Sequence, residues 1–145
     1  MTPKEPYLLG LVRIRLANLK PDPMKHIQNT KVDRLVEGFR KFGCGNAINK
    51  HAIPALMDRA RFQDALAQAG IQSFSLCDVE EGSQPLSLPD SEKLAILYGE
   101  HRLEAARRHL PADNRWWLVK VYDRSRFHNI HENQTWTLTD HRHVF

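Results

Sequence analysis

The stretch from residue 94 to residue 110 constrains the fold more than any other part of the chain. Five residues of strand character, Leu94–Tyr98, run directly into Gly99, and strong helix formers follow the glycine. Leu103 and Leu110 recur at helical spacing, which predicts that one side of this helix is buried. The pattern therefore predicts a buried strand, a tight turn at the glycine and a helix that begins at once.

The residues at this turn are suited to binding an anion. The first backbone N–H groups of a helix have no partner within it, and the helix dipole is positive there. Gly99 permits a positive φ or a close approach to the backbone, while His101 and Arg102 add donors. The corner predicts a phosphate site, provided that Gly99 starts the helix and Glu100 stays outside the core. An ordinary junction with solvated charges is the alternative.

The rest of the chain predicts a small α/β domain. Residues 11–16 alternate apolar and polar side chains, as a half-buried strand does, and place Arg13 and Arg15 on the outer face. Further expected elements are a helix from a Thr30 cap to Gly43 with Val32, Leu35, Val36, Phe39 and Phe42 as its apolar stripe, a strand over 52–56 at a sheet edge because of Pro54, a helix from Asp58 to Gly70, a loop over 80–90 and a strand over 116–122. We expect helices packed on a small mixed sheet.

Two adjacent tryptophans, Trp116 and Trp117, lie on the last expected strand. Neighbouring strand residues point to opposite faces, so one indole is expected in the core and the other outside it. The outer indole is either covered by a helix or left as a contact platform. With Arg13 and Arg15, it supports an alternative function, a non-catalytic module that binds nucleic acid or protein.

Length and charge limit the remaining possibilities. The 145 residues form a single expected domain, with 124–145 as a short helix and a flexible tail. No apolar run reaches the roughly 20 residues of a membrane helix, and the first residues do not resemble a secretory signal. A cytoplasmic or nuclear protein without a membrane partner is expected. The net charge of +4 mildly favours a polyanionic partner.

The corner also resembles a known signature. Gly99-Glu-His-Arg102, followed by Glu104-Ala-Ala106, resembles the Gly-Glu-Arg-Arg-x-x-Ala-Ala signature of the ParB N-terminal domain. It is similar to the Gly-Cys-His-Arg signature of sulfiredoxin, which shares that fold. His131–Gln134 resembles the later Glu-Asn-x-Gln box of ParB, and the likeness extends from about Leu8 to Gln134. The chain resembles more closely a set of fungal proteins with a divergent ParB-like domain and no established activity.

The resemblance implies a ParB/sulfiredoxin-like fold that binds a nucleotide, CTP or ATP with Mg²⁺, and hydrolysis or transfer of phosphate as a further step. It implies that Gly99, Glu100, His101 and Arg102 line the triphosphate, that Glu132 and Asn133 lie near the metal, with Glu132 as its ligand, and that Glu100 is the catalytic base. A solvated tail is the alternative for Glu132 and Asn133. Glu100 replaces the sulfiredoxin cysteine, so thiol chemistry is excluded. His101 replaces an arginine, so phosphate affinity is expected to be weaker or pH-dependent.

Overall fold

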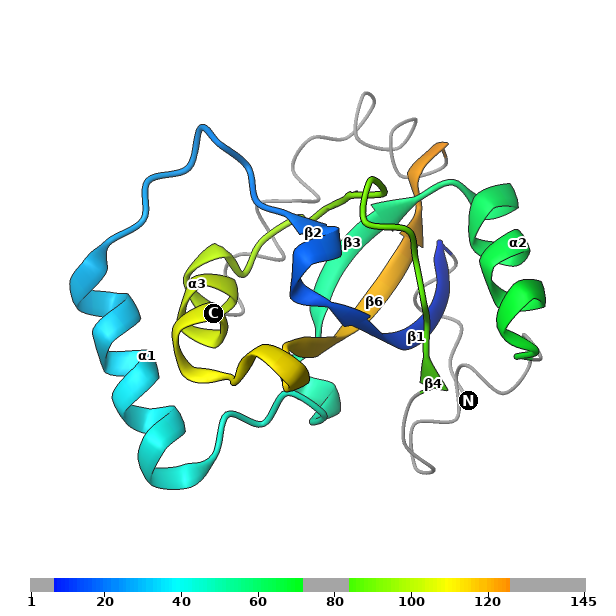
Figure 1. Ribbon diagram of the computed structural model, residues 1–145. Coiled ribbons are helices and arrows are strands. Elements are labelled where there is room, and N and C mark those ends of the chain that lie inside the picture. Colours follow the sequence, from blue (N-terminus) through cyan, green and yellow to red (C-terminus); the bar gives the residue numbers. More distant parts are fainter. Residues whose placement is uncertain (1–6, 72–83, 126–145) are drawn as a thin grey trace.

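The computed structural model describes residues 7–71 and 84–125 and shows a small α/β domain (Figure 1). Its elements are β1 (Leu8–Arg15), η1 (Leu16–Asn18), β2 (Leu19–Lys20), α1 (Asn29–Phe42), η2 (Asn49–His51), β3 (Ile53–Met57), α2 (Arg59–Ala69), β4 (Gln84–Pro85), β5 (Leu94–Ala95), α3 (Glu100–His109), η5 (Ala112–Asn114) and β6 (Trp116–Asp123). The predicted alternation of strands and helices is confirmed. From residue 126 onward, the expected tail lies outside the described residues.

A four-stranded mixed sheet forms the centre of the domain, in the order β3-β6-β1-β4. Strand β6 runs antiparallel to β1 and parallel to β3, while β4 pairs briefly with β1 in parallel. Pro54 lies on β3, which is an edge strand as predicted, because proline lacks the N–H that an inner strand donates. Two short strands, β2 and β5, form a separate parallel pair.

The two faces of the central sheet carry different side chains. Ile14 of β1 lies opposite Trp117 of β6, and both are fully buried in the main core. One position along each strand, Arg15 lies opposite Trp116 on the other face. The predicted separation of the two tryptophans is confirmed, because a pleated strand turns successive side chains to opposite sides.

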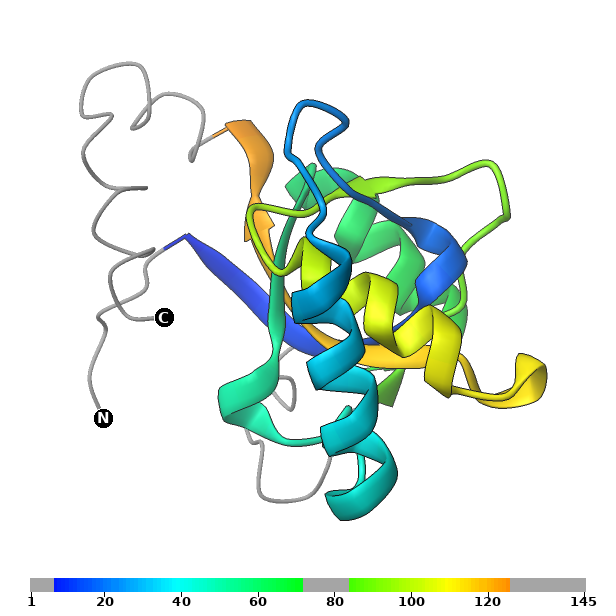
Figure 2. The ribbon, with the colours of Figure 1, turned by 90° about the vertical axis from the view of Figure 1, so that its left-hand side faces the viewer.

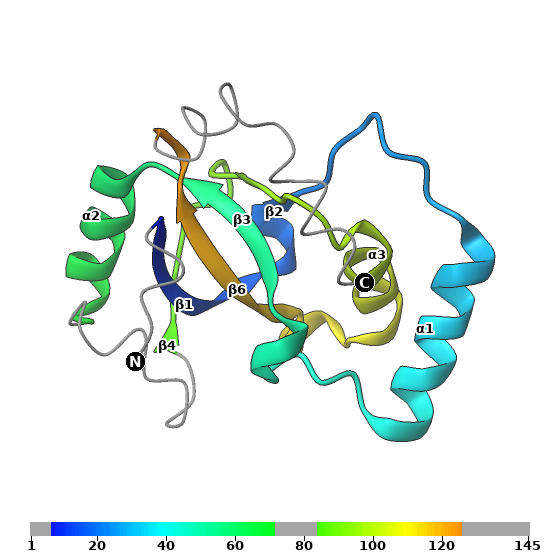
Figure 3. The same ribbon diagram turned by 180° about the vertical axis from the view of Figure 1, so that it is seen from behind.

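The helices gather at two ends of the sheet. Helices α1 and α3 pack against each other at one end, and α2 lies at the other, as the front and back views show (Figures 1 and 3). Figure 2 looks onto the end where α1 and α3 run side by side. No helix within 7–71 or 84–125 is long and apolar enough to cross a membrane.

Two details of α1 correct the sequence prediction. The cap position is Gln28, so Thr30 lies inside the first turn and does not start the helix. Phe42, expected in the apolar stripe, is 86% exposed, whereas Phe39 is buried. Phe42 is the last residue of the helix, and the chain leaves the core at Gly43, so its ring extends beyond the surface that α3 covers.

The strand predicted over residues 94–98 is also corrected. Only Leu94 and Ala95 form β5, paired with β2, and the chain then changes partner. Ile96 makes an isolated bridge to Ala55, and the Leu97 N–H donates to the β3 edge. Because the segment switches from one strand to another, it forms no continuous ladder. It still delivers the chain to Gly99 beside β3.

Candidate functional site

Gly99 starts α3, as the sequence predicts. It occupies the cap position with φ +103° and ψ 19°, a left-handed conformation that favours glycine. Its carbonyl accepts the first helical hydrogen bond, from the N–H of Leu103, at 2.8 Å. A Cβ at this position would lie 3.3 Å from Cγ1 of Ile53, so the turn sits close against β3. Both the backbone angle and the close approach explain the glycine.

The first turn of α3 presents backbone donors. The N–H groups of Glu100, His101 and Arg102 precede the first helical bond, and no side chain caps this end. The positive end of the helix dipole lies at the same place. The main-chain part of the predicted anion site is therefore in position.

Glu100 departs from the expectation that it stays outside the protein interior. Its side chain is only 6% exposed. One carboxylate oxygen lies 3.7 Å from Nζ of Lys25, and the other accepts a long bond of 3.5 Å from the N–H of Asp22. A buried carboxylate needs such partners. Glu100 therefore holds the segment between β2 and α1 against the start of α3.

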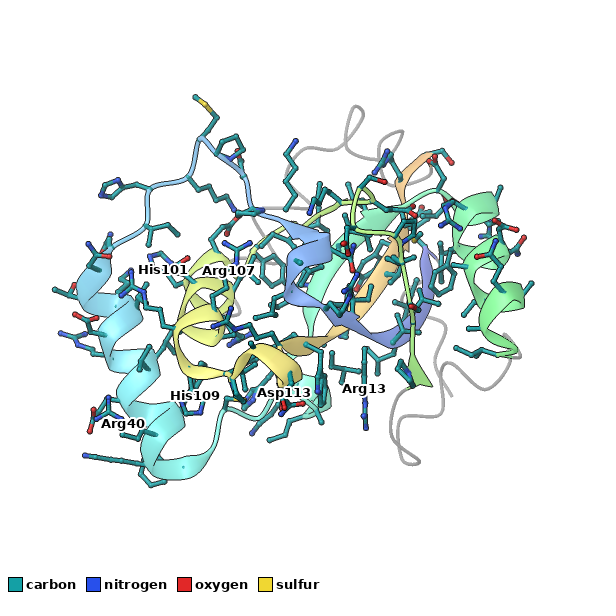
Figure 4. The ribbon with its side chains drawn as sticks, in the orientation of Figure 1. Arg13, Arg40, His101, Arg107, His109 and Asp113 are labelled. Carbon is teal, nitrogen blue, oxygen red and sulfur yellow. The ribbon has the colours of Figure 1, made fainter. Side chains whose placement is uncertain are left out.

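His101 holds the same segment at a second point. Its Nε2 accepts a hydrogen bond of 3.0 Å from the N–H of Gln28, the cap residue of α1. Figure 4 shows His101 on the side of α3 toward α1. An Nε2 that accepts a hydrogen bond carries no proton, so a phosphate donor on this ring would be Nδ1. The imidazole thus joins two helix ends.

Arg102 points its guanidinium toward the protein. Its Nη1 donates to the carbonyl oxygen of His51 at 3.2 Å, and the same oxygen accepts a bond of 2.8 Å from Nε1 of Trp117. Burial lowers the pKa of Arg102 from its usual value, and the nearby Tyr98 acts in the opposite direction. The guanidinium would have to leave the His51 carbonyl to grip a phosphate with both arms.

An open cleft of about 480 Å³ lies beside this corner. One wall is formed by Lys20–Pro23 and Lys25, and the other by Ala95–Tyr98 with Leu56. Lys25 also donates to the carbonyl oxygen of Leu97 at 3.2 Å, which ties the two walls together. The volume lies within the range of small-molecule sites.

Sequence reasoning missed the contribution of the segment after β2. Prolines at 21 and 23 predict a break in regular structure there, which says nothing of a nearby site. The pairing of Asp22 and Lys25 with Glu100 spans 78 and 75 positions of the chain respectively. The only local signal is a pair of lysines flanking a proline-rich turn.

The second set of predicted residues is not placed. Glu132 and Asn133 lie outside the described residues, so their predicted roles stay predictions. Within 7–71 and 84–125, no group of three histidine, cysteine, aspartate or glutamate side chains could hold a metal ion. Mg²⁺ bound to a nucleotide needs only one or two carboxylates besides the phosphates. Asp22 and Glu100 are the acidic residues beside the cleft.

Comparison with known proteins identifies a family and no close relative. No curated protein and no solved structure matches the chain. None of the comparisons links it to ParB or to sulfiredoxin. One family matches residues 8–142, nearly the whole length, and covers β1 through β6 with the corner and its cleft. The chain therefore belongs to the family described as protein of unknown function (DUF3723), N-terminal domain.

Proposed function

We propose that this domain binds the phosphate groups of a nucleotide, CTP or ATP with Mg²⁺, in the cleft at the amino end of α3. The observation that carries the proposal is the cleft itself. It brings Lys20 and Lys25 beside the uncapped first turn that follows Gly99. Ammonium groups and helix-start amides are the donors that phosphate oxygens accept. The resemblance of the corner to the ParB signature supports the same ligand.

Within this proposal the corner residues divide their roles. The amides of Glu100, His101 and Arg102 offer hydrogen bonds, and Gly99 allows the close approach. The side chains of Glu100 and His101 hold the segment from Asp22 to Gln28, which carries Lys25. These two side chains act as positioning groups. Direct phosphate contact by His101 or Arg102 requires each to exchange a present hydrogen bond.

The metal and the chemistry follow from the same geometry. When bound, Mg²⁺ would neutralise charge on the phosphates. Asp22 lines the cleft, and Glu132 with Asn133 are the residues that the ParB resemblance assigns to the metal. Glu100 is the candidate base for hydrolysis, and to act on water it must part from Lys25. Phosphate release with Glu100→Gln tests that role separately from binding.

Lys20 is the residue that best tests binding. Its side chain is exposed on a two-residue strand, so Lys20→Ala leaves the fold intact. We expect it to weaken CTP or ATP binding about tenfold, which is the effect of losing one charge-assisted hydrogen bond. Equilibrium dialysis with labelled CTP and ATP, with and without Mg²⁺, measures the change. Lys41→Ala, an exposed lysine on α1, is the matched control and should bind as the unchanged protein does.

Two results would contradict the proposal. One is the absence of binding of either nucleotide at millimolar concentration, which the alternative of a non-catalytic interaction module predicts. The other is an equal loss of affinity in Lys20→Ala and Lys41→Ala, which would indicate general attraction to a basic protein.

A further inference from the structure

A second hollow lies on the face of the sheet turned away from the main core. Trp116 lies there opposite Arg15, and the guanidinium carbon of Arg13 sits 4.5 Å from the centre of the Trp116 ring. Figure 4 shows Arg13 extending away from the ribbon. Trp116 is partly exposed, and its Nε1 donates to Oδ1 of Asn114 at 2.7 Å. A flat cation and a flat aromatic ring are thus stacked at the surface.

The hollow beside this pair is small and basic. Its volume is about 290 Å³. Its lining consists of Arg13, Arg15, Pro85, Leu86, Ser87 and Trp116. Among the described lining residues none is acidic, and the apolar parts come from an indole, a proline and a leucine. This combination suits a flat, partly apolar group attached to a negative charge.

Arg15 can change its partner at little expense. It donates to Oδ1 of Asp90 at 2.7 Å and to the carbonyl oxygen of Leu88 at 3.1 Å. The side chains of Arg15 and Asp90 are 51% and 87% exposed. Exposed ion pairs of this kind are weak, since water screens both charges. A phosphate could therefore replace Asp90.

We propose that this hollow binds single-stranded nucleic acid, with a base stacked on the Trp116–Arg13 pair and a backbone phosphate at Arg15. Single strands expose their bases, and aromatic rings with neighbouring cations are how proteins bind them without reading sequence. The net charge of +4 favours a polyanion over a neutral partner. In the cleft at α3 the charged side chains hold protein segments. Here they surround a surface hollow.

Labelled short oligothymidylate and oligouridylate, measured by fluorescence anisotropy at low salt, test the proposal. We expect Trp116→Leu to weaken binding about tenfold, through the loss of one base stack. Arg13→Ala should weaken binding and lower the dependence of log affinity on log salt concentration by about 0.7, as for one lost phosphate contact. Arg40→Ala is the matched control, because Arg40 is an exposed arginine on α1, away from this face.

Several outcomes would overturn the proposal. No binding at low salt would leave a protein as the partner of this face. Equal losses in Arg13→Ala and Arg40→Ala would indicate binding through net charge alone. Unchanged affinity in Trp116→Leu, or equally tight binding of a duplex whose bases are paired, would exclude stacking. Lys20→Ala should leave strand binding intact, so this result is independent of nucleotide binding at α3.

Discussion

The corner at the start of α3 and the hollow at Trp116 use the same kinds of residues in opposite ways. At the corner, Glu100 is 6% exposed and paired with a lysine. Arg102 donates to a main-chain carbonyl. At the hollow, Arg15 is half exposed and its acidic partner is more so. Charged groups at the corner hold the fold together, whereas those at the hollow are available to a ligand.

The difference follows from burial. A polar group removed from water must find a partner inside the protein, so the corner side chains bond to neighbouring segments. An exposed group keeps its hydration and exchanges partners easily. Substitutions at the corner should therefore change stability first, and substitutions at the hollow should change binding first.

The two adjacent tryptophans give the largest contrast. Trp117→Ala should lower the free energy of unfolding by about 3–5 kcal/mol, because it empties a fully buried site and removes a bond to His51. Trp116→Ala should lower it by less than about 1 kcal/mol, because only a surface contact with Arg13 is lost. Urea unfolding followed by circular dichroism measures both. Similar losses would mean that the outer face is as tightly packed as the core.

Gly99→Ala should have the next largest effect, a loss of about 2 kcal/mol in the free energy of unfolding. It adds the strain of a left-handed backbone to the close contact with Ile53. The control is Gly70→Ala at the end of α2, which is left-handed too but has open space around it. It should lose about 1 kcal/mol. If the two variants are equally stable, Ile53 yields and the corner is less tightly held than its geometry indicates.

Arg102→Met should have the smallest effect on stability, below about 1 kcal/mol. The His51 carbonyl keeps its bond from Trp117, and the desolvated charge that lowers the pKa of Arg102 is removed. Nucleotide affinity should change little if the amides and lysines hold the phosphate. A stable variant that loses nucleotide binding would instead show that Arg102 leaves His51 and grips the ligand, as the ParB resemblance implies.

Local patterns in the sequence were sufficient for much of the fold. The strand and helix order, the edge position of Pro54 and the opposite faces of the two tryptophans follow from periodicity and backbone chemistry, which act over a few residues. The same holds for Gly99 at a helix start. Patterns of this kind leave the partner of each segment open, so the strand predicted over 94–98 came out shorter.

The amino-acid sequence by itself determined that a glycine corner begins a helix and presents its amides, because a left-handed turn before strong helix formers is a local property. Only the tertiary structure decided where the side chains of that corner point. Glu100 and His101 reach residues more than 70 positions earlier, and their direction depends on which segment the folded chain brings beside them. Burial then decides whether a charge serves the fold or remains at the surface for a ligand.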